Sequence, residues 1–88
     1  MDGMTHSLKI TATGLVTLGT IQVQQFEWSG SGSSGDTLLI VDNNGKVVWA
    51  ATAAGTPYDL YKSYGRPAGI QGLSVTTLSS GTLVIYYV

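Results

Sequence analysis

One stretch of the sequence has the spacing of a nucleotide-binding loop. Residues 30–35 (GSGSSG) match the pattern G-x-G-x-x-G, which binds a pyrophosphate when it follows a strand and opens a helix. The residues after the third glycine, 36–41, have the aliphatic composition of a strand, so no helix N-terminus would face a phosphate. A chain of 88 residues is also too short for a dinucleotide-binding fold. We therefore interpret residues 30–35 as a loop.

Other residue types with catalytic or metal-binding chemistry occur singly. His6 is the only histidine, and it has no nucleophile or acid at a spacing typical of catalysis. The run Asp42-Asn43-Asn44 lacks the alternating ligands and the closing Glu of a calcium loop. The chain has no cysteine, which excludes disulfides and thiolate metal sites. The sequence therefore predicts no catalytic residue, no metal site and no cofactor, and we expect a protein that is not an enzyme.

A cluster of aromatic and basic side chains is the candidate binding site. It consists of Tyr58, Tyr61, Lys62, Tyr64 and Arg66. Tyrosine and arginine are enriched at binding hot spots because they combine a large contact area with a polar group. Three interpretations are open: the segment packs on the protein's own sheet, contacts another protein, or binds a sugar or another ligand.

Charged residues are few. Four basic and five acidic residues make up 10% of the sequence, whereas ordinary soluble domains have about 25%. Four scattered cations do not supply the clustered positive charge that nucleic acids attract. From Pro67 to Val88 the chain has no charge, yet polar residues interrupt every apolar run well before the roughly 20 residues of a membrane helix. We expect no nucleic-acid partner and no membrane span.

The length predicts a single domain, residues 1–88. A domain of this size buries only roughly 60–65% of the surface that its unfolded chain exposes. Association with copies of itself or with a larger assembly is therefore an expected source of stability. The N-terminus has Asp2 where a secretory signal would be basic, and no apolar segment follows. The sequence thus predicts synthesis without a signal peptide.

Hydrophobic periodicity predicts β-strands over most of the chain. Residues 8–12 alternate apolar and polar side chains. The alternation changes phase between Val23 and Phe26, which predicts a β-bulge near Gln24-Gln25.

Two hairpins are predicted from turn residues. Residues 37–41 and 46–51 flank the sequence DNNG, whose Asn-Gly pair tolerates the positive φ of a tight turn. Residues 73–78 and 82–88 flank Ser79-Ser80-Gly81 in the same way. The last run, Leu83 to Val88, is apolar on both faces, so we expect it in the centre of the sheet or covered by a neighbouring subunit.

One segment, residues 56–65, departs from the strand pattern. Thr56 suits an N-cap, Pro57 the first helical position and Gly65 the residue after the last turn, which together predict a short helix. The expected fold is all-β: a compact β-sandwich or small barrel of about six or seven antiparallel strands with one short helical insert.

Aromatic, glycine and aliphatic positions form a framework over residues 26–88. It comprises Phe26-x-Trp28, Gly35-Asp36-x-Leu38-x-Ile40-x-Asp42, Gly45-x-Val47 and Gly72-Leu73-x-Val75-x-x-Leu78-x-Ser80-Gly81-x-Leu83-x-Ile85-Tyr86. This framework resembles a group of small virion-associated structural proteins of tailed bacteriophages.

The resemblance implies a non-enzymatic β protein of the virion, made in the host cytoplasm. Such a protein decorates or cements the capsid by binding the major capsid protein, or it fits onto other virion subunits at the neck or tail. The resemblance also implies a homo-oligomer, with a trimer favoured. A host-surface or glycan-binding module, with Tyr58, Tyr61, Tyr64 and Arg66 as its contact face, is the alternative.

Overall fold

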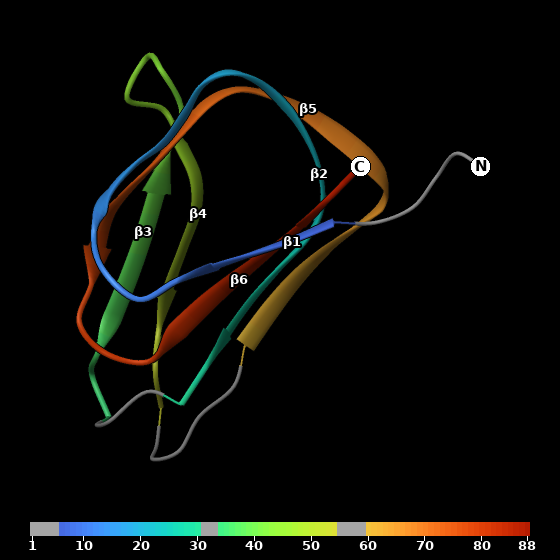
Figure 1. Cartoon of the computed structure of the whole chain (residues 1–88). Coiled ribbons are helices and arrows are strands. Elements are labelled where there is room, and N and C mark those ends of the chain that lie inside the picture. Colours follow the sequence, from blue (N-terminus) through green and yellow to red (C-terminus); the bar gives the residue numbers. More distant parts are fainter. Residues whose placement is uncertain (1–5, 31–33, 55–59) are drawn as a thin grey trace.

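A computed structural model of the chain describes residues 6–30, 34–54 and 60–88, and over these residues the protein is all-β without a helix. The strands are β1 (His6–Ile10), β2 (Gly14–Ser29), β3 (Thr37–Val41), β4 (Val47–Thr52), β5 (Leu60–Leu78) and β6 (Thr82–Tyr87). They form one open sheet in the order β1-β6-β2-β5-β3-β4, and every neighbouring pair is antiparallel (Figure 1).

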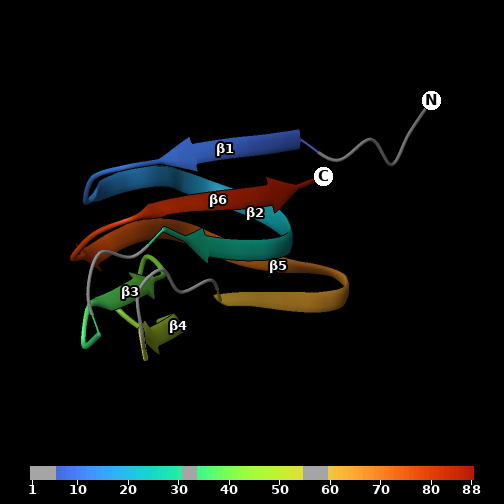
Figure 2. The same cartoon turned by 90° about the horizontal axis from the view of Figure 1, so that it is seen from below.

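The two long strands β2 and β5 form a curved ribbon in the centre of the sheet. Their pairing runs from Gly14 opposite Val75 to Trp28 opposite Leu60, with three shifts in register. Strand β6 pairs with β2 at one end of this ribbon, and β3 pairs with β5 at the other. Figure 2 shows the bend of the ribbon. Because of this bend, the strands paired with its two ends, β6 and β3, surround one interior.

The curled sheet encloses a single hydrophobic core. Phe26 of β2 stacks on Trp49 of β4 with ring centroids 5.8 Å apart, although β5 and β3 lie between these strands in the sheet. The fully buried large side chains are Trp28, Phe26, Leu38, Ile40, Leu73, Leu83, Ile85, Val23 and Val75. The all-β prediction is confirmed with six strands, but one open, curled sheet takes the place of the expected two-sheet sandwich or closed barrel.

The predicted bulge in β2 is confirmed. Pairing of β2 with both β5 and β6 shifts between Val23 and Gln25. An extra residue at this point changes which face each following side chain meets. Val23 and Phe26, three positions apart, are consequently both buried in the core.

The DNNG hairpin is also confirmed, between β3 and β4. The Asp42 N–H donates to the Lys46 carbonyl at 3.0 Å, and Gly45 has a positive φ of 75°. The Asp42 carboxylate oxygen Oδ1 accepts hydrogen bonds from the N–H groups of Asn44 and Lys46. Aspartate at this position therefore acts as a turn residue.

The predicted helix is wrong over the part of it that is described. Residues 60–65 belong to β5, where Leu60 lies opposite Trp28 and Tyr61 opposite Glu27. A two-turn helix is unstable by itself, whereas the tyrosine-rich strand gives the edge of β2 a hydrogen-bonding partner. Pro67 lies where the pairing with β2 is interrupted, a position that tolerates proline. Residues 55–59, the start of the predicted helix, lie outside the described residues.

The second predicted hairpin is also wrong. Strand β6 pairs with β1 and β2 and not with β5. At Ser74 and Val75 both edges of β5 are occupied, by β2 and β3, and β3 continues along β5 to Leu78. The turn at Ser79-Ser80-Gly81 therefore carries the chain past β2 to the far side of the sheet. There β6 lies between β1 and β2 with Leu83 and Ile85 buried, so the prediction of a central position for this apolar strand is confirmed.

Candidate interaction surface

The face of the sheet that points away from the core forms a platform over four strands. Across β1, β6, β2 and β5, the register places Lys9, Val84, Glu27 and Tyr61 in one row, and Gln25 lies opposite Tyr86 in the next row. Directly opposed residues in a sheet project from the same face. We call these six residues the outer platform.

Alternation along the strands explains why these side chains point outward. Successive side chains of a strand project from opposite faces. Phe26 and Trp28 are buried in the core, so Glu27 between them faces out. In the same way, the buried Leu83 and Ile85 of β6 turn Val84 outward.

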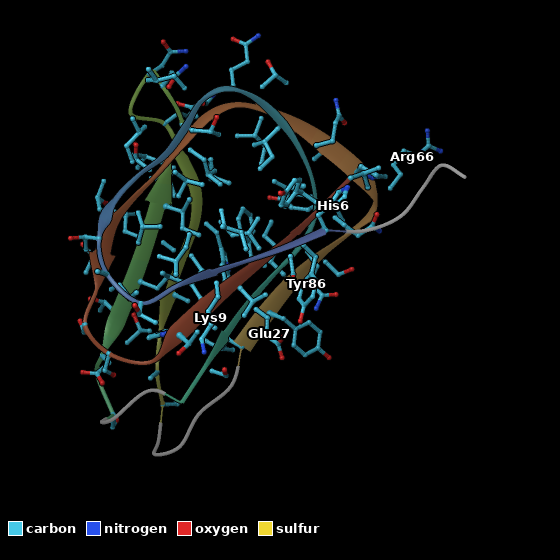
Figure 3. All side chains as sticks on the ribbon, viewed as in Figure 1. His6, Lys9, Glu27, Arg66 and Tyr86 are labelled. Atoms are coloured by element: carbon cyan, nitrogen blue, oxygen red, sulfur yellow. The ribbon has the colours of Figure 1, made fainter. Side chains whose placement is uncertain are left out.

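The centre of the outer platform contains a hydrogen bond between two strands. The Tyr86 hydroxyl donates to Oε1 of Glu27 at 3.0 Å, and Figure 3 shows both side chains in one region with Lys9. This hydrogen bond to Glu27 raises the pKa of Tyr86 above its usual value of 10.0, and the negative charge of Glu27 and partial burial raise it further. Tyr86 therefore stays neutral and keeps the hydroxyl proton that it donates, and this hydrogen bond holds the Glu27 carboxylate in a defined orientation.

We expect Tyr86 to titrate above its ordinary pKa, and the Glu27→Gln variant to bring that pKa down toward 10.0. Because the folded-state pKa is raised, the bond stabilises the fold fully below the unfolded pKa, and this stabilisation is lost as pH rises through the folded pKa. NMR titration of isotope-labelled tyrosines measures the shift, with Tyr86→Phe assigning the signal.

Tyr64 provides the internal control for this titration, because burial alone raises its pKa. Its titration should be unchanged in Glu27→Gln. Equal shifts of Tyr64 and Tyr86 in that variant would contradict a specific bond between Glu27 and Tyr86.

Tyr61 supplies the largest exposed aromatic surface of the platform. Its side chain is 68% exposed, on the row that also holds Glu27. An exposed tyrosine beside an oriented carboxylate offers a partner an apolar ring and a hydrogen-bond acceptor on the same face of the sheet.

The structure separates the residues of the predicted aromatic cluster. Tyr61 faces outward, whereas Tyr64 is half-buried with its ring edge against Phe26, centroids 6.2 Å apart. Lys62 is exposed, and its Nζ lies 5.4 Å from the centroid of the Tyr64 ring. Arg66 is exposed and lies well apart from Glu27 and Lys9 (Figure 3). Tyr58 lies outside the described residues, so the structure brings Lys62 to Tyr64 but does not place Tyr61 with them.

Sequence reasoning missed Glu27 and Tyr86 as hydrogen-bonded surface residues, and Lys9 as a member of the same row of the sheet. The alternation around Phe26 and Trp28 was sufficient to predict that Glu27 faces outward. Its contact with Tyr86 spans 59 positions and depends on β6 pairing with β2, which no local pattern in the sequence indicates.

Several residues of the framework described in the sequence lie together at one corner of the fold. The Trp28 indole Nε1–H donates to the Ser80 carbonyl at 2.8 Å, and the Ser80 hydroxyl bonds to the Asp36 carboxylate. Next to them, the Thr37 N–H donates to Oγ of Ser79 at 3.1 Å. These contacts tie the end of β2 to the start of β3 and to the β5–β6 turn, so we assign these framework residues a structural role.

Comparison with known proteins identifies no relative of this chain. Neither a scan against models of protein families nor a search of curated proteins finds a match. Within the part of the chain that the structure describes, no group of three or more His, Cys, Asp and Glu side chains could hold a metal ion. Among the residues that the structure describes, there is also no helix long and apolar enough to cross a membrane.

Proposed function

We propose that this chain is a non-enzymatic structural protein of a bacteriophage virion, a decoration or cement protein that binds the major capsid protein. The outer platform carries the proposal, because it combines an exposed tyrosine, an oriented carboxylate and a lysine on one face of four hydrogen-bonded strands. Interfaces typically use aromatic anchors surrounded by polar groups in this way.

Exposed apolar side chains support the same proposal. Besides Tyr61, the side chains of Leu18, Leu15 and Val47 are 70%, 59% and 58% exposed. A small domain with few charges gains stability when such side chains are covered by neighbouring subunits. The resemblance of the framework to small phage virion proteins points to a capsid as the covering assembly.

Copy number in purified particles is the first test. A decoration protein should be present in near-stoichiometric ratio to the major capsid protein, which quantitative mass spectrometry of virions measures. A few copies per particle would contradict decoration and support a neck or tail position instead.

Binding of the purified chain to particles that lack it tests the outer platform itself. Tyr61→Ala should weaken binding at least roughly tenfold, as loss of a hot-spot aromatic does. Lys62→Ala is the control and should bind unchanged, because Lys62 is exposed on the same strand but lies opposite the buried Phe26, on the other face of the sheet. Co-sedimentation with particles measures both affinities, and an unchanged affinity of Tyr61→Ala would overturn the platform as the binding face.

A glycan-binding module is the second candidate, and the exposed ring of Tyr61 favours it, since sugars stack on exposed aromatic rings. Glu27 and Gln25 lie beside this ring as hydrogen-bonding groups. Glycan-array binding that is lost in Tyr61→Ala while incorporation into particles stays intact would favour this function over decoration.

A further inference from the structure

Among the described residues, β4 is an outermost strand of the sheet, and its own sequence carries little protection against pairing with another strand. Its six residues, VVWAAT, include no charge, glycine or proline. Natural edge strands are usually protected by charges, proline or bulges. The opposite outer strand, β1, carries His6 and Lys9. In β4 a shift in register places one extra residue at Val48, and from Trp49 onward the pairing with β3 is regular.

The hydrogen bonds of Ala53 define which backbone groups of β4 point away from β3. Its N–H donates to the Asp36 carbonyl, and its carbonyl accepts from the Gly35 N–H, both at 2.8 Å. In an antiparallel ladder, alternate residues direct their N–H and C=O groups to opposite sides. Ala51 therefore also bonds toward β3, while Ala50 and Thr52 direct both groups outward. Both of these residues are exposed.

We propose that β4 pairs antiparallel with β4 of a second copy of this chain, about a two-fold axis at Ala51. In this register Ala50 lies opposite Thr52 of the second copy, and each of the two symmetric pairs exchanges both N–H···O=C bonds. Ala51 lies opposite the same residue of the second copy. The irregular residue Val48 lies outside the paired stretch.

The composition of β4 favours a second copy as its partner. Since β4 carries no charge, a two-fold axis brings no like charges together. Alanine and threonine at the paired positions leave room for the backbones to approach. On the outward face, Thr37, Leu39, Ala50, Thr52 and Thr77 line a shallow, uncharged groove of about 360 Å³ that is continuous with this edge.

This pairing also covers apolar surface. Trp49 is only partly buried in the single chain, and the proposed register places it opposite Ala53 of the second copy. The interface does not overlap the outer platform, so it stands independently of the proposed function. A two-fold contact gives a dimer, whereas the trimer expected from the phage resemblance requires two different surfaces in head-to-tail contact.

A single engineered cysteine tests the position of the axis, because the natural chain has none. Residues facing each other in a pair without mutual hydrogen bonds have Cα atoms about 4.5 Å apart, a separation that a disulfide spans. Ala51→Cys should form a disulfide-linked dimer under mild oxidation, seen on non-reducing electrophoresis. Val47→Cys is the control, since Val47 is 58% exposed on the same strand but lies away from the axis. Equal cross-linking of the two variants, or none at Ala51, would overturn the proposed register.

Sedimentation equilibrium of the purified chain tests the dimer without cross-linking. Each copy has a mass of 9.2 kDa, and we expect a concentration-dependent dimer. Ala50→Pro removes an N–H that points away from β3, so it should leave the fold intact and raise the dimer dissociation constant at least tenfold.

A charged variant and a conservative one complete the test. Thr52→Lys should also prevent dimerisation by placing a charge on the edge, whereas Thr52→Ser should behave as the unmodified chain. Far-UV circular dichroism establishes that each variant is folded. A monomer at every soluble concentration, a trimer, or a dimer that persists in folded Ala50→Pro would each overturn the proposal.

Discussion

Replacing Gly72 by alanine is expected to destabilise the fold by roughly 3 kcal/mol or more. Gly72 lies in β5 between Gln71 and Leu73, where the pairing with β2 shifts in register, and it has a positive φ of 80°. A Cβ atom built on it would overlap the side-chain amide of Asn43 in the β3–β4 turn. Two hydrogen bonds restrict the movement of Asn43. Its side-chain Nδ2 donates to the Leu18 carbonyl at 2.8 Å, and its backbone N–H donates to the Gln71 carbonyl at 2.9 Å.

Two separate effects make up this loss. Holding an alanine in the left-handed region costs about 1–2 kcal/mol. Displacing Asn43 breaks its bond to Leu18, which contributes on the order of 1 kcal/mol, and disturbs the contact between the turn and the ribbon. Small domains have total stabilities of only about 5–15 kcal/mol, so Gly72→Ala removes a large fraction. Urea unfolding followed by far-UV circular dichroism measures the change.

Gly45→Ala is the matched control for Gly72→Ala. Gly45 has a similar positive φ of 75°, but open space surrounds the position of its Cβ, so only the backbone effect of about 1–2 kcal/mol remains. In the double variant Gly72→Ala/Asn43→Ala the overlap is absent, and part of the stability should return. Equal losses in Gly72→Ala and Gly45→Ala would show that Asn43 does not restrict this position.

Local sequence patterns predicted the features of the fold that depend on few consecutive residues. The turn of the β3–β4 hairpin follows from Asn44-Gly45, and the bulge in β2 from the change of phase after Val23. Both features are fixed by backbone preferences and by which side chains must be buried. They are therefore visible without knowledge of the partner strands.

The errors arose where a distant strand decides the local structure. Residues 60–65 have acceptable helix signals, but pairing with β2 makes them a strand. The turn at residues 79–81 has acceptable hairpin signals, but β3 already occupies the edge of β5 there. Tertiary pairing outweighs local propensities of a few tenths of a kcal/mol per residue.

The candidate site was predictable only in part for the same reason. Tyr61 was identified from its type, and the structure exposes it on the outer platform. Glu27 and Tyr86 become neighbours only through the pairing of β2 with β6. The predicted association of Tyr61 with Tyr64 assumed a helix, whose periodicity brings positions three apart together, whereas a strand places them on opposite faces.

Replacing Trp28 tests whether the corner made by the framework residues holds the fold. Trp28 is fully buried, and its indole N–H donates to the Ser80 carbonyl at 2.8 Å. Truncation of a buried tryptophan to alanine costs about 3–5 kcal/mol, so Trp28→Ala is expected to unfold much of the protein. Trp28→Phe keeps most of the buried area but loses the hydrogen bond, and we expect a loss of roughly 2 kcal/mol.

Trp49→Phe separates the hydrogen bond at Trp28 from a general loss of aromatic area. Trp49 is partly buried, and a phenylalanine there can keep the stacking on Phe26, so its substitution should cost about 1 kcal/mol or less. Urea unfolding of the two variants gives the comparison. If Trp28→Phe is no more destabilising than Trp49→Phe, the bond to Ser80 contributes little, and packing alone holds the corner. A larger loss at Trp28 means that the framework residues specify how β2 meets the β5–β6 turn, the pairing that local sequence patterns failed to predict.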